Sequence, residues 1–283
     1  MTALLQHCPL GCNSTLETTD FTLPEGALRR CTACAQLISS CSVETFEKTM
    51  QEWDNEDGTM PTGRDAIRHR KRITKLLKHL LRFIGKSAES MSLLDVGCSS
   101  GSSLQVALDF GFGVVKGVEP AQAPAETAIS NGFDVTVGFL EDACYKDSSF
   151  DVILLFEVIE HLPEPLPLIK EIHRILKPGG ILLLSTGNAL SWTANVLGAR
   201  WTFFSMQEHG GHISFFSPQS IRILAELTKF TLLDVQTRRM ILTERAISTR
   251  LTYKPLKLAS ELLSPLARMA GKGHQMYAYL NKV

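Results

Sequence analysis

A glycine-containing turn in the first half of the chain has residues suited to holding a nucleotide-like ligand. The apolar run 92–96 contains Asp95 near its end, and the chain then turns through Gly97 and Gly101 into a segment of helical periodicity. Such a turn directs backbone N–H groups and the positive end of a helix toward a bound ligand. Glu119 follows the next apolar run, where a carboxylate can accept hydrogen bonds from both hydroxyls of a ribose. The two features together predict an adenosine-containing ligand.

The same turn does not have the pattern of a dinucleotide site. A GxGxxG loop needs a second glycine where Ser99 stands, and that loop serves to hold a pyrophosphate. A cofactor with an amino acid end therefore fits these residues better than NAD does.

Two glutamates and a histidine come directly after the apolar run 152–156, at Glu157, Glu160 and His161. In one interpretation His161 is a general base that one of the glutamates orients. In the other, which we favour, the segment is the structural start of the next helix.

A second polar cluster lies at residues 207–212, after a segment rich in aromatic side chains. Its candidates for acid–base chemistry are Glu208, His209 and His212. For the histidines, a general-base role, a substrate-positioning role and simple packing are all open, and metal ligation is least favoured because a third ligand is lacking nearby. The aromatic residues around this cluster are typical of a lid that covers a substrate.

The cysteines near the N-terminus have the spacing of a structural zinc site. Two close pairs, Cys8 with Cys12 and Cys31 with Cys34, are separated by 18 residues, which lets four thiolates surround one tetrahedral ion. His7 is an alternative ligand. About 45 residues cannot form a sufficient apolar core unaided, so we expect zinc to hold this segment together.

Short apolar runs alternate with segments of helical period from residue 65 onward. Apolar runs of this kind fit strands that are buried on both faces of a parallel sheet, and the alternation predicts a doubly wound α/β domain. The expected helices are 102–110, 121–131 and 166–176. The expected strands are 92–96, 114–118, 135–137, 152–156, 181–185, 231–237 and 275–280.

The overall charge gives no general attraction to polyanions. The 283 residues include 29 basic and 29 acidic ones, so the formal net charge is zero, and nucleic acid is not expected as a partner. The N-terminus lacks the features of a secretory signal, and apolar runs fall short of the about 18 residues that span a bilayer. We therefore expect a cytoplasmic protein.

One helix is strongly basic on one face. Residues 64–86 hold nine lysines and arginines against Asp65 alone, while apolar residues recur at helical spacing. A solvated helix that covers the sheet is the preferred interpretation. The alternative is a contact with a phosphorylated substrate or an anionic lipid surface. A second helical segment, 256–270, is apolar enough to pack or to face a partner.

Five motifs in order give the chain a family resemblance. The series resembles the class I S-adenosylmethionine-dependent methyltransferases, and its motifs are residues 94–101, 117–120, 149–153, 157–162 and 174–180. The family loop usually has glycine at the position of Ser99, and many members have aspartate at the position of Phe139. The resemblance implies a seven-stranded, Rossmann-like, mostly parallel sheet.

The resemblance also implies roles for single residues. Asp95 orients the loop, Glu119 holds the ribose, and residues after the third strand contact adenine. The full set of cofactor-binding residues is Asp95, Gly97, Ser99, Gly101, Glu119, Pro120, Leu140, Glu141, Phe156 and Glu157. Some sugar and natural-product methyltransferases resemble the arrangement of a zinc ribbon ahead of the catalytic domain.

These observations predict a zinc-ribbon-like module at 1–45, a linker at 46–63 and a methyltransferase domain at 64–283, with a lid at about 187–220. The predicted activity is transfer of the methyl group of S-adenosylmethionine to O, C or N of a sugar, a lipid-linked precursor or a natural product. A cofactor-binding regulatory or scaffold protein without catalysis is the alternative. A nucleic-acid methyltransferase is disfavoured by the zero net charge.

Overall fold

A seven-stranded sheet forms the centre of the protein. The computed structural model describes residues 3–54, 59–208, 210–244 and 249–283. The strands are β4 (Ser92–Val96), β5 (Val114–Glu119), β6 (Val135–Val137), β7 (Phe150–Phe156), β8 (Leu176–Gly187), β10 (Phe230–Arg238) and β11 (Gln275–Lys282). Their spatial order is β10-β11-β8-β7-β4-β5-β6, and only β11 runs antiparallel to its neighbours. The predicted doubly wound α/β architecture with seven strands is confirmed.

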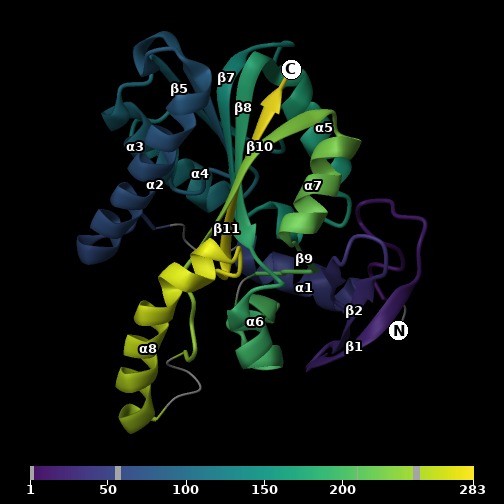
Figure 1. The fold of residues 1–283 in the computed structure, drawn as a ribbon. Coiled ribbons are helices and arrows are strands. Elements are labelled where there is room, and N and C mark those ends of the chain that lie inside the picture. The colour runs from purple at the N-terminus through teal and green to yellow at the C-terminus, as the bar shows by residue number, and fades with distance from the viewer. Residues whose placement is uncertain (1–2, 55–58, 209, 245–248) are drawn as a thin grey trace.

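Helices cover both faces of this sheet (Figure 1). On one side lie α2 (Gly63–Ile84), α3 (Ser102–Phe110) and α4 (Gln122–Ser130), and on the other lie α5 (Pro165–Ile175) and α7 (Pro218–Leu227). Successive strand residues point to opposite faces. In β7, Val152 packs in the same cluster as Leu76 of α2, whereas Ile153 packs in the cluster of α5 and α7. This two-sided burial explains the continuous apolar runs in the sequence.

The helix starts follow from local chemistry. Ser217 caps α7: its hydroxyl accepts a hydrogen bond from the Ser220 backbone N–H, and Pro218 occupies the first turn. The remaining helical elements are α6 (Trp192–Leu197), α8 (Arg250–Met269) and the short 3₁₀ turns η1 (Ala88–Ser90), η2 (Ile159–His161), η3 (Gly198–Arg200) and η4 (Thr202–Phe204). Among the described residues, no helix is both long and apolar enough to cross a membrane.

The N-terminal module is built into the larger domain. Its strands β1 (Leu16–Leu23), β2 (Gly26–Cys31) and β3 (Leu37–Ile38) are antiparallel, and β3 pairs in turn with β9 (Ser214–Phe215) from the predicted lid. The backbone N–H of Ser39 also donates to the carbonyl of Ile213, at 2.8 Å. The two predicted domains therefore share one four-stranded sheet.

Helix α1 (Val43–Asp54) occupies the first half of the predicted linker at 46–63. Ser42 accepts a hydrogen bond from the Thr45 backbone N–H at 3.1 Å, as helix-capping residues do. Phe46 packs on a small apolar cluster that contains Ile38, and Thr49 is buried. Acidic composition predicted a linker here, and a cap with one anchoring face makes its first half helical. Residues 55–58 lie outside the described part of the chain.

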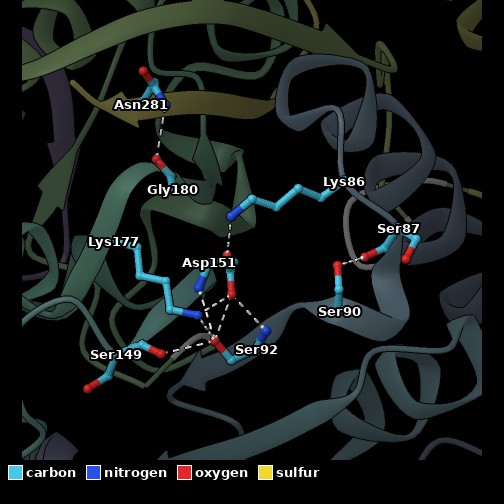
Figure 2. A network of polar contacts seen from close by, with 9 residues as sticks. All are labelled: Lys86, Ser87, Ser90, Ser92, Ser149, Asp151, Lys177, Gly180 and Asn281. Atoms are coloured by element: carbon cyan, nitrogen blue, oxygen red, sulfur yellow. Dashed lines mark hydrogen bonds and ion pairs between the residues drawn. The ribbon is translucent and has the colours of Figure 1, made fainter.

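A buried carboxylate ties together the amino ends of three strands and the segment after α2 (Figure 2). Asp151 of β7 accepts hydrogen bonds from Lys177 at 2.5 Å, from Lys86 at 3.0 Å and from the backbone N–H and hydroxyl of Ser92 at 3.0 and 2.9 Å. Burial alone would raise the pKa of Asp151, yet these hydrogen bonds from Lys177, Ser92 and Lys86 hold its pKa well below the ordinary value.

We predict that Asp151→Asn lowers the free energy of unfolding by about 2 kcal/mol at neutral pH, because two ammonium groups lose their charged acceptor. Since the folded-state pKa is lowered, the stabilisation is present above the unfolded pKa of about 4 and is lost as pH falls toward the folded value. Urea unfolding of both proteins should thus show a difference that shrinks below about pH 4. Asp147→Asn, at a largely exposed side chain, is the control. An equal loss in both variants would contradict the assignment.

Candidate functional site

The glycine loop lies where the predicted site requires it, at the carboxyl ends of the parallel strands. After β4, the backbone N–H groups of Gly97 and Cys98 donate to the Val118 carbonyl of β5 at 2.8 and 3.2 Å. Gly97, Ser99 and Gly101 all have positive φ, at 75°, 47° and 90°. Ser99, where the loop departs from its family, thus adopts a left-handed conformation that glycine takes more easily.

The two glycines are also required by neighbouring side chains. A Cβ atom on Gly97 would lie 2.5 Å from Cγ2 of Val158, and one on Gly101 would lie 2.4 Å from the ring of Phe133. The sequence prediction attributed these glycines to close approach by a ligand. Close packing against the protein itself is a further reason for them.

Glu119 holds the loop from the end of β5. Its carboxylate accepts hydrogen bonds from the backbone N–H of Ser99 at 2.8 Å and of Ala121 at 3.0 Å, and the side chain is buried. The predicted ribose-binding residue therefore lies directly against the glycine loop. A carboxylate oxygen has more than one acceptor position, so Glu119 can accept from ligand hydroxyls as well.

Asp95 is a buried carboxylate beside Glu119. Burial raises its pKa well above the ordinary value, and the negative charge of Glu119 raises it further. Among the described residues, none makes a hydrogen bond to its Oδ1 atom. A positively charged ligand group would satisfy this oxygen and offset the repulsion between the two carboxylates. The donor and acceptor set therefore fits the ammonium and sulfonium charges and the ribose hydroxyls of S-adenosylmethionine.

The other predicted cofactor-binding residues differ in how far they are exposed to solvent. Leu140 is buried after β6, whereas Pro120 and Glu141 are exposed, and Phe156 is half-buried at the end of β7. Glu157 is exposed with a φ of 54°, and its Oε1 atom accepts a hydrogen bond from Ser185 at 2.7 Å.

Helix α2 brings residues to the site that the sequence did not single out. His69 lies between the hydroxyls of Ser102 and Ser103, with its Nε2 atom 3.3 and 3.4 Å from them, at the start of α3. Burial, assisted by the charge of Arg72, lowers the pKa of His69 to about 4. Arg72 also lies close enough to Tyr277 to affect its pKa, which burial raises. The basic pattern of this helix was noticed, but periodicity could not tell which of its residues face the loop.

A second group of polar residues is buried between η2 and β9. Glu160 is fully buried, and its Oε1 atom lies 3.8 Å from Nε2 of His212. Burial raises the pKa of Glu160 well above its usual range, with a further contribution from the charge of Glu157. The rings of His161 and His212 meet edge to face with centroids 4.7 Å apart. Three of the residues predicted at this edge, Glu160, His161 and His212, are therefore brought together.

The histidines are oriented by backbone carbonyls. Nδ1 of His161 lies 2.8 Å from the carbonyl oxygen of Gly210, and Nδ1 of His212 lies 2.8 Å from that of Phe203. A carbonyl only accepts, so both Nδ1 atoms carry the donated proton. His212 is buried, while His161 is half-buried. Glu208 is exposed and its side chain is not part of this cluster, and His209 lies outside the described residues.

Aromatic residues of the predicted lid segment form a wall beside the histidines. Trp201 stacks on Phe203 with centroids 5.0 Å apart, and Phe203 lies 4.4 Å from the ring of His212. The same cluster contains Leu28 and Leu37 of the N-terminal module. Packing from the module therefore supports the wall that borders the histidines.

The four predicted zinc ligands lie together at one end of the module. The Sγ atoms of Cys8, Cys12, Cys31 and Cys34 all lie within 4.8 Å of one another, and the four thiols are free. Sγ of Cys8 and Sγ of Cys34 are 3.5 Å apart, much longer than a disulfide bond. Tetrahedral zinc with Zn–S bonds of about 2.3 Å requires sulfur atoms separated by about 3.8 Å. The cluster therefore fits a zinc ion.

Known proteins provide an independent comparison. A model of the methyltransferase domain family matches residues 67–235. The ubiquinone biosynthesis O-methyltransferase of Histophilus somni is 31% identical over 194 residues, covering 62% of this chain and 76% of that protein. The 2-methyl-6-phytyl-1,4-hydroquinone methyltransferase of Synechocystis sp. is 38% identical over 103 residues, covering 34% of this chain and 32% of that protein.

A solved structure supports the fold. The S-adenosylmethionine-dependent methyltransferase of Mesorhizobium loti superposes with a TM-score of 0.53 at 16% identity, covering 73% of this chain and 96% of that chain. The residues that the family model matches include the glycine loop, Glu119 and the pair Glu160 and His161. The chain therefore belongs to the methyltransferase domain family and is an S-adenosylmethionine-dependent methyltransferase.

Proposed function

We propose that the chain methylates a hydroxyl oxygen of a lipid-linked aromatic precursor. The observation that carries the proposal is the half-buried His161 with the buried Glu160 and His212, beside an aromatic wall. A phenolic acceptor needs a proton acceptor and an apolar surface for its ring. The similar Histophilus protein is named for O-methylation in ubiquinone biosynthesis, and the Synechocystis protein for a phytyl hydroquinone. Both names are consistent with an aromatic acceptor that has an apolar tail.

Bound S-adenosylmethionine supplies an electrophilic methyl group on a positively charged sulfur. Asp95, whose Oδ1 atom has no hydrogen-bond donor among the described residues, would accept from the ammonium group of the cofactor, and Glu119 would accept from the ribose hydroxyls while it holds the loop through the backbone N–H of Ser99. His69 of α2 lies against the hydroxyls of Ser102 and Ser103 at the start of α3, and Arg72 lies 3.1 Å from His69. We propose that these two residues border the amino acid end of the site.

We predict that Glu119→Ala weakens S-adenosylmethionine binding by at least about tenfold, because the ribose and the loop both lose their charged acceptor. Calorimetric titration of both proteins measures this. Glu126→Ala, on the exposed surface of the neighbouring helix α4, is the matched control and should bind as the wild type does. Equal affinity of Glu119→Ala and the wild type would exclude the ribose assignment.

His161 is the proposed proton acceptor for the substrate hydroxyl. His161 lies three residues after Val158, which contacts the glycine loop. It is also more exposed than His212. His212 is a positioning residue, since it is buried against His161 and fixed by the Phe203 carbonyl. The nearby Glu160 supports the orientation of His212 and stabilises any positive charge that the imidazole pair takes up.

We predict that His161→Ala lowers kcat for a catechol with an isoprenoid tail by about 10²- to 10⁴-fold, with little change in cofactor affinity. His212→Gln retains a donor for the Phe203 carbonyl, so it should keep more activity than His212→Ala. Steady-state methyl transfer from labelled cofactor gives kcat and the KM for the cofactor in each variant. Wild-type kcat in His161→Ala would exclude His161 as the base.

The N-terminal module is proposed to hold a structural zinc ion in the Cys8, Cys12, Cys31 and Cys34 cluster. Four thiolates leave no open coordination position, so the ion has no catalytic water. Its proposed role is to fix β3, which lies three residues after Cys34 and pairs with β9 of the lid.

We predict about one zinc ion per purified chain, lost in Cys34→Ser together with a lower unfolding temperature of the module. Cys144→Ser, at an exposed cysteine far from the cluster in sequence, should retain both the metal and the stability of the wild type. Metal analysis and calorimetry test this. A metal-free wild-type protein with the same unfolding profile as the zinc-loaded one would contradict the proposal.

A further inference from the structure

Helix α8 presents a continuous apolar face to solvent. Its exposed apolar side chains recur every three, four or seven residues and therefore lie on one side of the helix. Leu262 is 70% exposed and Met269 is 84% exposed. The face consists of Leu251, Pro255, Leu258, Leu262, Pro265, Leu266 and Met269. Surface helices ordinarily bury such a face against the core.

The opposite side of the helix is the one that packs on the protein. Ala267 is buried, and the hydroxyls of Ser260 and Ser264 accept hydrogen bonds from the backbone N–H groups of Leu242 and Met240 at 2.9 and 3.0 Å. The helix is therefore anchored largely through small and polar side chains, and the leucines of the exposed face point away from the body. Figure 1 shows α8 projecting from the rest of the molecule.

A basic groove lies beside this helix, between α2, β10 and the end of α8. Its volume is about 570 Å³, and its cations come from all three elements: Lys75, Lys78, Arg82, Arg238 and Arg268. None of the five forms an ion pair with any carboxylate in the described ranges, and the neighbouring Asp234 pairs with His79 at 2.8 Å instead. The groove therefore concentrates positive charge in a protein whose net charge is zero.

The apolar face and the basic groove belong to the same edge of the sheet as the cofactor site. Arg238, at the end of β10, is in register with Gln275, and Gln275 is in register with Gly187, at the end of β8. Strand β8 is parallel to β7, which leads into the Glu160 cluster. Helix α8 lies in the connection between β10 and β11, at this edge of the sheet.

We propose that α8 and the basic groove dock the enzyme on an anionic lipid bilayer. Leucine and methionine side chains enter the acyl boundary, while the groove cations contact lipid phosphates, which is how interfacial helices bind. Charge favours a bilayer over a second copy of the chain, because pairing the same face in a symmetric dimer brings two basic grooves together. Docking in this way turns the acceptor edge of the sheet toward the membrane, independently of which acceptor is methylated.

Vesicle flotation of the full chain tests the docking surface. The protein should bind phosphatidylcholine vesicles that contain about one third phosphatidylglycerol, bind pure phosphatidylcholine much more weakly, and dissociate as salt rises. The double variant Leu258→Gln, Leu262→Gln should lose at least about tenfold in partitioning, and so should Lys75→Glu, Lys78→Glu. The matched controls are Leu227→Gln on α7 and Lys48→Glu on α1, both at exposed positions, and they should bind as the wild type does.

Three outcomes would overturn the proposal. The first is equal binding of the α8 and groove variants and of their controls. The second is no binding to anionic vesicles at all. The third is a wild-type dimer in solution that the Leu258→Gln, Leu262→Gln variant converts to a monomer without any effect on vesicle binding. Cofactor affinity, measured in parallel on the same variants, should not change, which separates failure of the docking surface from failure of the active site.

Discussion

Burial of the central strands on both faces decides where polar groups can be. The interior residues of β7, from Val152 to Leu155, are completely buried in apolar surroundings, so the charged groups of this strand and its neighbours lie at or near the two ends. At the amino end, Asp151 has two ammonium groups within hydrogen-bond distance. At the carboxyl end, Asp95 has Glu119 as its charged neighbour. The carboxyl pKa is thus lowered for Asp151 at one end of the strands and raised for Asp95 at the other.

The carboxylate that stabilises the fold and the carboxylates suited to binding a ligand therefore lie at opposite ends of the strands. At the amino end, the charge of Asp151 is balanced by Lys86 and Lys177, so removing either partner lowers the stability of the protein. The carboxyl end has buried carboxylates, Asp95 and Glu160, whose negative charge is not balanced by an ammonium or guanidinium partner among the described residues. Such an arrangement costs stability in the free protein and favours a positively charged ligand. A cofactor with both an ammonium and a sulfonium charge meets this requirement at Asp95, beside the loop that Glu119 holds in place.

Local signals in the sequence were sufficient for the strands, the glycine loop and the Ser217 helix start, because each depends on residues within a few positions of one another. Helix α1 was missed since acidic composition outweighed a cap at Ser42 that could have been recognised. Pairing of β3 with β9 joins residues that are far apart in the chain, and two-residue strands have no periodicity to detect. The burial of His212 also depends on residues far away in the chain. The sequence therefore could not separate buried His212 from exposed Glu208, which lie only four residues apart.

The shared sheet connects the N-terminal module to the cluster of Glu160, His161 and His212. Strand β9 is only two residues long, and such a short strand is not stable without a partner that is itself fixed. Its partner β3 begins three residues after Cys34 and packs Leu37 against the aromatic cluster of Phe203 and Phe215. His212 lies just before β9 and donates to the Phe203 carbonyl. The position of the buried histidine therefore depends on residues of the first 45, because backbone pairing and ring contacts connect the segment that follows the four thiols to His212.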